Sequence, residues 1–279
     1  MAVRTAAGRS VDIGAPYFTA RDPGFVQIVQ GWVGRGLARP WTDTFHVATP
    51  DQGLQGTTTG PVRYAASGGL GLLVEDLASG LDVTHPWQVR AVAPGPTVDG
   101  SAAPAVVLAM PDPQALDLLS EDLTLERDLV SGRVWEPVLV LVASWIRRTW
   151  PAVDAVFVNE SPVLTFVVDD GARSGDGAAV LVVHADPVFS AGHLHDPDSA
   201  APAMLAELAV VLGVTGPPEW VEVTCWATAR PPSTARSRPF HLGPSMVALA
   251  GDGWHGPARV EAAYLSGRAL GHELAGRLR

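Results

Sequence analysis

The chain has 279 residues, of which 47% are hydrophobic, and its 19 basic and 29 acidic side chains give a formal net charge of −10. This composition can form an ordinary core, and the acidic balance argues against a nucleic-acid partner, because no basic stripe is present to displace phosphate counterions. Every basic residue is an arginine and Cys225 is the only cysteine, which excludes lysine chemistry such as a pyridoxal Schiff base, intramolecular disulfides and cysteine-based zinc sites.

No targeting or membrane segment is apparent in the sequence. Residues 1–10 contain no apolar run of the kind found in signal peptides. The longest apolar stretch, Val138–Ile146, is too short to cross a bilayer core of about 30 Å. We therefore expect a cytoplasmic protein of mixed α/β structure, with no membrane partner.

In the first half of the chain, apolar spacing predicts two helices and a strand. Phe25–Gly36 and Leu72–Leu81 have helical periodicity and end at glycines. Ala105–Met110 is a continuous apolar run, which is typical of a strand buried on both faces. A short helix is expected to follow from Pro113.

The second half predicts an antiparallel sheet followed by a helix. Pro202–Leu212 is a long apolar helix, which Asp198 and Ser199 are placed to cap. The predicted strands are Val138–Ile146, Ala155–Val158, Val163–Val168, Ala179–His184 and Trp220–Ala227.

The C-terminal segment predicts a strand, a glycine-rich turn and a helix. Met246–Ala250 is the strand, Gly251–Gly256 the turn, and Pro257 or Ala258 begins a helix that runs to the C-terminus. One face of this helix is expected to carry Val260, Tyr264, Leu270, Leu274 and Leu278. A turn that exposes the first N–H groups of a helix is suited to bind an anion.

The turn contains a literal G-x-G-x-x-G motif formed by Gly251, Gly253 and Gly256. A dinucleotide-binding βαβ unit needs a second strand, with an acidic residue at its end about 20 residues further on. Glu273 lies at that distance, but inside the same predicted helix. The motif is therefore interpreted as a chance match.

Four segments in chain order carry a more specific pattern. They are Val11–Arg21 (V-D-I-G-A-P-Y-F-T-A-R), Val107–Ala115 (V-L-A-M-P-D-P-Q-A), Trp226–Pro231 (W-A-T-A-R-P) and Gly251–Gly267, which contains Gly-Asp and Arg-Val-Glu. Together they resemble the renalase-like FAD/NAD(P)-dependent oxidoreductases of the flavin amine-oxidase superfamily, nearly from end to end. The last segment resembles the C-terminal flavin signature of that superfamily.

The resemblance implies an α/β (α+β) fold of the amine-oxidase type, with two domains. A discontinuous FAD-binding domain would comprise residues 1–24, 62–119 and 238–279. A substrate domain built on an antiparallel sheet would comprise residues 25–61 and 120–237.

Members of this family begin with a strand, a G-x-G-x-x-G loop and a helix, which precede a Gly-Gly-Arg-Met motif. Met1 stands where the methionine of that motif would be. We therefore expect the chain to lack about forty residues that carry the pyrophosphate loop, an estimate based on the size of a βαβ unit. The FAD-binding domain would then be incomplete, and this chain alone is expected to bind FAD poorly.

The activity implied by the resemblance is that of an FAD-dependent oxidoreductase. Such an enzyme accepts a hydride from a small dihydronicotinamide-type or amine substrate and passes the electrons to O2, which yields H2O2. The alternative is a non-catalytic, FAD-incompetent remnant or a mis-started fragment of such an enzyme. A hydrolase is disfavoured because no G-x-S-x-G elbow occurs.

The resemblance implies cofactor-binding residues in the C-terminal segment. Asp252, after Gly251, corresponds to the family aspartate that binds FAD, although Gly-Asp after a strand is also a common turn. Val260 and Glu261 would offer backbone N–H groups to the flavin edge, while Glu261 is equally a favourable first-turn acid. Arg259 is either a cofactor contact or a solvated surface residue.

Two further segments would approach the cofactor. Pro16 and Tyr17 stand at the family's Gln-Tyr pair, but proline replaces the glutamine, so only backbone contacts carry over at that position. Tyr17 is alternatively a core aromatic residue. Met110 would face the cofactor from the end of a strand, or simply mark where a buried strand stops.

Other candidate residues have ordinary explanations. His193, His195, Asp196 and Asp198 could suggest a metal site, but helix capping explains the last of them, and no metal is expected. His255 could act as an acid or base, though a solvated turn histidine is the simpler interpretation. Trp135, Trp145, Trp150 and Trp226 could line a pocket but are expected mostly in the core. No catalytic residue is identified from the sequence.

Overall fold

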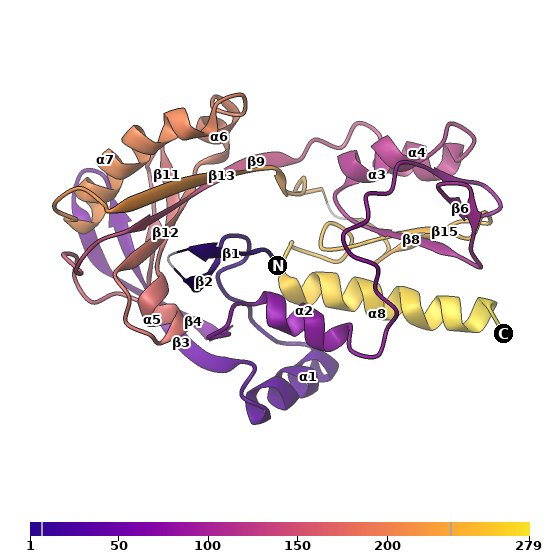
Figure 1. Cartoon of the computed structure of the whole chain (residues 1–279), viewed down its shortest axis with the longest axis horizontal. Coiled ribbons are helices and arrows are strands. Elements are labelled where there is room, and N and C mark those ends of the chain that lie inside the picture. Colours follow the sequence, from indigo (N-terminus) through magenta and orange to yellow (C-terminus); the bar gives the residue numbers. More distant parts are fainter. Residues whose placement is uncertain (7, 235) are drawn as a thin grey trace. The chain divides into compact units, whose positions relative to one another are not determined.

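The computed structural model describes residues 1–6, 8–234 and 236–279, which form two compact units (Figure 1). The first unit comprises Met1–Gly80 and Pro137–Ala227, and the second comprises Leu81–Glu136 and Thr228–Arg279. Residues 1–24 and 62–80, which the resemblance assigns to the FAD-binding domain, therefore lie in the same unit as residues 25–61. The division into a cofactor domain and a substrate domain stays a prediction.

A seven-stranded sheet in the order β13-β9-β12-β11-β10-β3-β4 forms the centre of the first unit. All neighbours in this sheet whose register is recorded are antiparallel except β10 and β3, which are parallel. The strands are β3 (Arg39–Thr49), β4 (Gly53–Ala65), β9 (Glu136–Ser144), β10 (Ala155–Val158), β11 (Leu164–Asp169), β12 (Val180–Ala185) and β13 (Trp220–Arg230). The predicted strands between residues 138 and 227 are confirmed, with small shifts at their ends.

Helix α7 (Ala201–Leu212) packs on one face of this sheet (Figure 1). Its buried residues Met204, Leu208 and Val211 contact an apolar layer that includes Leu141 and Leu181. The burial of this layer removes apolar surface from water, which stabilises the unit. The sheet and α7 thus contain the main core of the first unit.

The predicted cap of α7 is wrong. Pro197–Ala200 forms a 3₁₀ turn, η1, that continues directly into α7, and the helix has no side-chain cap. The Ser199 hydroxyl instead donates to the backbone oxygen of Asp196, at 2.6 Å. The first N–H groups of α7 follow a preceding helical turn, so a capping side chain is not needed there.

Smaller elements complete the first unit. Helix α1 (Pro23–Gly34) is capped by Asp22, whose carboxylate accepts from two backbone N–H groups. Helix α2 (Gly71–Leu77) is shorter than predicted and ends before Gly80, whose φ is +82°. The others are β1 (Val3–Ala6), β2 (Arg9–Asp12), α5 (Asp170–Ser174) and α6 (Pro187–Ala191).

A buried ion network joins β2 to α5. The Arg173 guanidinium lies 2.7 Å from a carboxylate oxygen of Asp12 and 2.7 Å from one of Asp170. Arg9 also pairs with Asp170 and donates to Ser174. Burial raises the pKa of Asp12 to about 6, against the opposing effects of Arg173 and of the Leu70 N–H. Buried charges of this kind persist only when they are paired.

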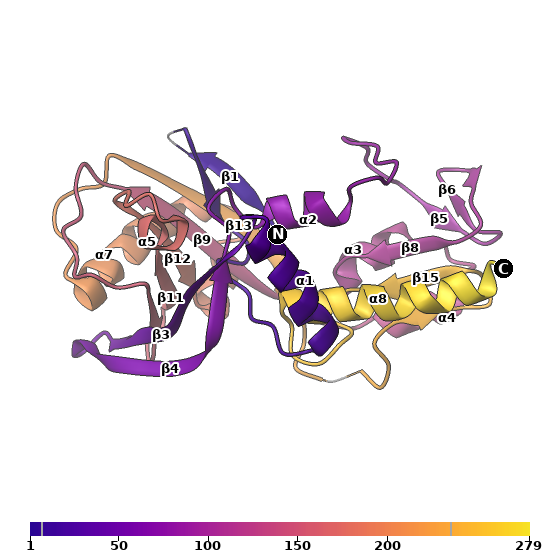
Figure 2. The same ribbon diagram turned by 90° about the horizontal axis from the view of Figure 1, so that it is seen from below.

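The second unit is built on a three-stranded sheet in the order β14-β15-β8. Strands β15 (Val247–Ala250) and β8 (Val106–Ala109) are parallel, and β14 (His241–Leu242) is antiparallel to β15. Helix α8 (Val260–Arg277) packs alongside β15 (Figure 2). The remaining elements are β5 (Val92–Ala93), β6 (Thr97–Val98), β7 (Ser101–Ala102), α3 (Asp112–Leu118) and α4 (Thr124–Val130).

Two predictions for this unit need correction. Strand β8 is not buried on both faces: Val106 and Leu108 are in the core, but Val107 is 42% exposed. Side chains alternate between the two faces of the sheet, and only one face of β8 is covered. Helix α8 begins at Val260, two or three residues later than predicted, because residues 257–259 belong to the preceding turn.

The buried stripe of α8 also differs from the predicted one. Ala262, Ser266 and Leu270 are buried at steps of four residues, whereas Tyr264 is half-buried and Leu278 is exposed. Leu270 was predicted for this face and Leu274 packs against the same cluster, whereas the small residue Ala262 and the serine Ser266 were missed by the search for large apolar residues.

Among the residues that the structure describes, none of the helices combines the length and apolar character needed to cross a membrane.

Candidate functional site

The predicted site residues of the second unit gather at one edge of its sheet. Strands β8 and β15 run parallel, with Ala109 opposite Ala250. Met110 and Gly251 follow these residues directly, so the chain leaves the two strands at the same edge of the sheet. In open α/β sheets, ligands collect outside the carboxyl ends of the parallel strands. The structure therefore brings Met110, Gly251 and Asp252 to a position where a ligand would be expected.

The turn after β15 is held by specific contacts. The Gly251 N–H donates to the Ser266 hydroxyl at 3.0 Å, and this hydroxyl donates to the backbone oxygen of Pro239 at 2.6 Å. Gly251 has φ +139°, and an added Cβ would meet no atom within 4 Å. A Cβ on Gly253 would lie 3.0 Å from the Trp135 ring. Glycine is thus needed at Gly251 for its backbone conformation, and the space beside it is open.

Asp252 is a desolvated carboxylate at the start of this turn. Burial is the main cause that raises its pKa, and the negative charge of Asp112 adds to the effect. Backbone N–H groups of the turn, including that of Gly253, act in the opposite direction. A carboxylate with acceptor capacity in a desolvated turn can receive hydrogen bonds from ligand hydroxyl groups.

Asp112 is a buried residue of this edge that sequence reasoning missed. Its side chain is 2% exposed, and it accepts hydrogen bonds from Arg133 Nε at 2.9 Å, Trp135 Nε1 at 3.1 Å and Arg236 Nη2 at 2.6 Å. Two guanidinium groups therefore share one carboxylate. The only sequence signal was an aspartate directly after the strand end at Met110 and Pro111, and nothing linked it to arginines far along the chain.

The start of α8 supplies the remaining predicted residues. Arg259 is the N-cap residue, with extended backbone and no side-chain cap hydrogen bond, and Val260 is half-buried. Glu261 is buried in the first turn, where the helix dipole favours a negative charge. The position of Glu261 thus fits an acidic residue that is stabilised by the helix dipole. The contacts of all three residues with a cofactor stay predictions.

Pro16 and Tyr17 belong to the first unit. The Tyr17 ring lies 5.3 Å from that of Phe45 and 6.0 Å from that of Phe166, between centroids. The Arg63 guanidinium lies 3.8 Å from the Phe45 ring centroid. Tyr17 is therefore part of an aromatic cluster, and the predicted contact of Pro16 and Tyr17 with a cofactor stays a prediction.

The other candidates have structural partners. His193 Nδ1 lies 2.9 Å from the Ser199 hydroxyl, and within the described part of the chain no group of three or more potential metal ligands is arranged to hold an ion. His255 is half-buried in the turn before α8. Trp135, Trp145 and Trp150 are buried, and Trp226 Nε1 donates to the backbone oxygen of Ile13. The first three are thus core residues, as expected, and each also donates a hydrogen bond from its indole N–H.

Comparisons with known proteins agree on the fold. No family model matches the sequence. A solved structure of a putrescine oxidase double mutant, redesigned in cofactor binding, matches with a TM-score of 0.72 and 11% identity over 98% of this chain and 90% of the other. Cyclohexylamine oxidase from Brevibacterium oxydans IH-35A matches with a TM-score of 0.60 and 17% identity, over 79% of this chain and 55% of the oxidase.

A putative protoporphyrinogen oxidase from Exiguobacterium sp. 255-15 matches with a TM-score of 0.56 and 16% identity, over 76% of this chain and 52% of that one. The chain therefore spans about half the length of the latter two oxidases. The predicted fold class is confirmed: this is a mixed α/β protein with the fold of the amine-oxidase-type flavoproteins.

Proposed function

We propose that this protein is an FAD-dependent oxidoreductase that binds its cofactor at the carboxyl ends of β8 and β15. The observation that carries the proposal is the turn Gly251–Asp252, which lies between a parallel strand and the start of α8. It occurs in a fold shared with putrescine oxidase along nearly the whole chain. The names of the similar structures, which are oxidases, support the same class of reaction.

The residues at this edge fit the chemical groups of FAD. The open space beside Gly251 allows close approach of a ligand to the backbone. Asp252 offers carboxylate oxygens to hydroxyl groups of the kind found in a ribityl or ribose chain. The first N–H groups of α8, which lack a side-chain cap, stabilise negative charge at the edge of a flavin.

When bound, FAD would supply the hydride acceptor of the reaction, so that the protein need only bind and orient the reactants. The proposed substrate is a small dihydronicotinamide-type molecule or an amine, which loses a hydride. O2 takes up the two electrons and, with protons, becomes H2O2. The Trp135 ring packs against Gly253 on the inner side of the turn. We also propose that the protein is related to the renalase-like oxidoreductases, that it binds NAD(P)-type molecules and that it acts in the cytoplasm.

A titration of FAD against the purified protein, followed by the quenching of flavin fluorescence, tests the assignment of Asp252. Replacement of one charged hydrogen-bond acceptor costs about 1.5–3 kcal/mol. We therefore expect Asp252→Asn to weaken FAD binding by about tenfold or more.

The matched control is Asp117→Asn, which removes the same charge from an exposed position on α3 in the same unit. This variant should bind FAD like the unchanged protein. Equal FAD affinities of the Asp252 and Asp117 variants would refute the assigned cofactor site.

A further inference from the structure

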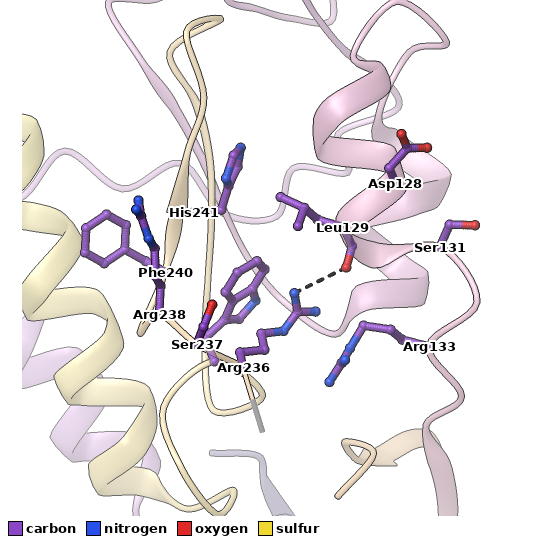
Figure 3. A pocket seen from close by; sticks show the side chains of 10 residues that line it. Asp128, Leu129, Ser131, Arg133, Arg236, Ser237, Arg238, Phe240 and His241 are labelled. Carbon is purple, nitrogen blue, oxygen red and sulfur yellow. Dashed lines mark hydrogen bonds between the residues drawn. The ribbon is translucent and has the colours of Figure 1, made fainter. Parts of the chain in front are cut away.

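The second unit contains a cavity of about 400 Å³ beside the Asp112 cluster. Figure 3 shows its two walls: Asp128, Ser131 and Arg133 come from the end of α4 and the segment after it, and Arg236 and Arg238 come from the segment before β14. Phe240 and Trp254 add aromatic surface. The volume lies in the range of small-molecule sites.

The walls of the cavity carry an excess of positive charge. Arg133, Arg236 and Arg238 line it, together with the carboxylate of Asp128, and Asp112 lies behind the first two. His241 also lines the cavity, and its burial lowers its pKa, which disfavours the charged form of its ring. Three guanidinium groups therefore line the cavity beside one lining carboxylate, while the carboxylates of Asp112 and Glu126 lie behind the walls, the latter 3.7 Å from His241 Nε2. The lining surface is thus cationic and suited to an anion.

Arg236 is the most informative residue of this wall. Its side chain is 8% exposed, its Nη2 donates to Asp112, and its Nη1 donates to the backbone oxygen of Leu129 at 3.2 Å (Figure 3). Its guanidinium packs on the Trp254 ring at 3.5 Å from the centroid. The buried Nε–H has no hydrogen-bond partner among the described residues. This nitrogen is inaccessible to a ligand in the cavity, so Arg236 acts there through its positive charge.

We propose that this cavity binds the phosphate group of a mononucleotide. Guanidinium groups match phosphate oxygens in geometry and charge, and Arg133 and Arg236 are held in place by the shared Asp112. The exposed guanidinium of Arg238 can donate to the phosphate oxygens, and Phe240 offers a face on which a base can stack. The site uses none of the residues proposed to bind the flavin, so it goes beyond the proposed function.

The test is isothermal titration of the full chain with AMP, adenosine and inorganic phosphate at constant ionic strength. We expect AMP to bind at least tenfold more tightly than adenosine, because the arginines recognise the phosphate. AMP should also bind more tightly than inorganic phosphate, because only the nucleotide contacts Phe240. The proposal would be overturned if adenosine bound as tightly as AMP, or if inorganic phosphate bound as tightly as AMP.

Two substitutions locate the binding. Arg238→Gln changes an exposed side chain, so the fold should be retained, and Arg133→Gln removes one of the two guanidinium groups held by Asp112. Each should weaken AMP binding by about tenfold. The control Arg90→Gln removes the same charge from an exposed position elsewhere in the unit and should leave AMP affinity unchanged.

Equal AMP affinities of the Arg238 and Arg90 variants would overturn the assignment of the cavity. The variant Asp252→Asn separates this site from the proposed flavin site, because it should bind AMP like the unchanged protein. A loss of AMP affinity in Asp252→Asn as large as in Arg238→Gln would also overturn the proposal.

Discussion

Two carboxylates at the same edge of the small sheet have different surroundings. Asp112 is enclosed by two guanidinium groups and an indole N–H, so its charge is compensated and serves structure. Asp252 lies in a turn where burial raises its pKa and where the neighbouring Asp112 adds to the rise. At the residue scale, Asp112 therefore holds the surrounding segments together, whereas Asp252 is the carboxylate that we propose for the ligand.

This difference predicts a large loss of stability in Asp112→Asn. The substitution leaves Arg133 and Arg236 without their shared countercharge, and removal of one partner of a buried pair costs about 3–5 kcal/mol. Urea unfolding followed by circular dichroism measures the loss. Asp117→Asn, at an exposed position of the same helix, should change the free energy of unfolding by about 0.5 kcal/mol or less. Similar stabilities of the two variants would contradict the role of Asp112.

The buried network of the first unit predicts a pH dependence. The pKa of Asp12 is about 6 in the folded protein, against an ordinary value of 3.8, so between these pH values the folded state binds more protons than the unfolded state. The stability that this group contributes is thus fully present below about pH 4 and is lost as the pH rises through 6.

The Asp12→Asn variant isolates this contribution, because its asparagine does not titrate. The free energy of unfolding of the unchanged protein minus that of the variant should fall by about 2–3 kcal/mol between pH 4 and pH 7. Urea unfolding at the two pH values measures it. A difference that stays constant or rises with pH would show that Asp12 does not have a raised pKa.

At the scale of elements, close backbone approach fixes where α5 can begin. A Cβ on Gly171 would lie 2.1 Å from the backbone oxygen of Ala178 and 2.5 Å from its nitrogen. We expect Gly171→Ala to lower the free energy of unfolding by about 3 kcal/mol, because backbone atoms have to move.

The control for this prediction is Gly31→Ala in α1, where a Cβ would meet nothing within 4 Å. Alanine is the better helix former, so this variant should gain about 0.5–1 kcal/mol. Thermal unfolding of both variants measures the effects. A Gly171→Ala variant as stable as the unchanged protein would contradict the described packing of α5.

Most elements could be predicted where burial produced a clear pattern. The helices α1 and α7 and the strands β10 to β12 have one or two buried faces, which give periodic or continuous apolar runs. The hairpin of β3 and β4 was missed, because most residues of β4 are exposed and polar. Strand β8 was wrongly predicted to be buried on both faces, because the sequence does not distinguish an exposed valine such as Val107 from a buried one.

The site was predictable only where its residues adjoin in sequence. Gly251 and Asp252 form one motif, and Met110 ends an apolar run, so the strand pairing brought predicted residues together. Asp112 and its partners Arg133 and Arg236 are separated by 21 and 124 positions. No local pattern links such residues, since only the fold places them in contact.

At the scale of the whole molecule, each unit combines two separate stretches of the chain, and the fold is that of amine-oxidase-type flavoproteins. The TM-scores of 0.56–0.72 to the similar structures show the shared fold, whereas the identities of 11–17% leave the chemistry to be argued from residues. The central claim is therefore that the edge formed by β8, β15 and α8 binds FAD and that the bound cofactor accepts a hydride.

The most direct test is the visible absorption spectrum of the purified chain after FAD has been added and free cofactor removed by desalting. The same sample is then treated under anaerobic conditions with dihydronicotinamides and small amines. The resemblance by itself led us to expect weak FAD binding by this chain. The proposed site at β8, β15 and α8 predicts the opposite: flavin bands remain after desalting and are bleached by at least one of these compounds. A colourless protein, or bound flavin that none of them bleaches, would contradict the proposed function.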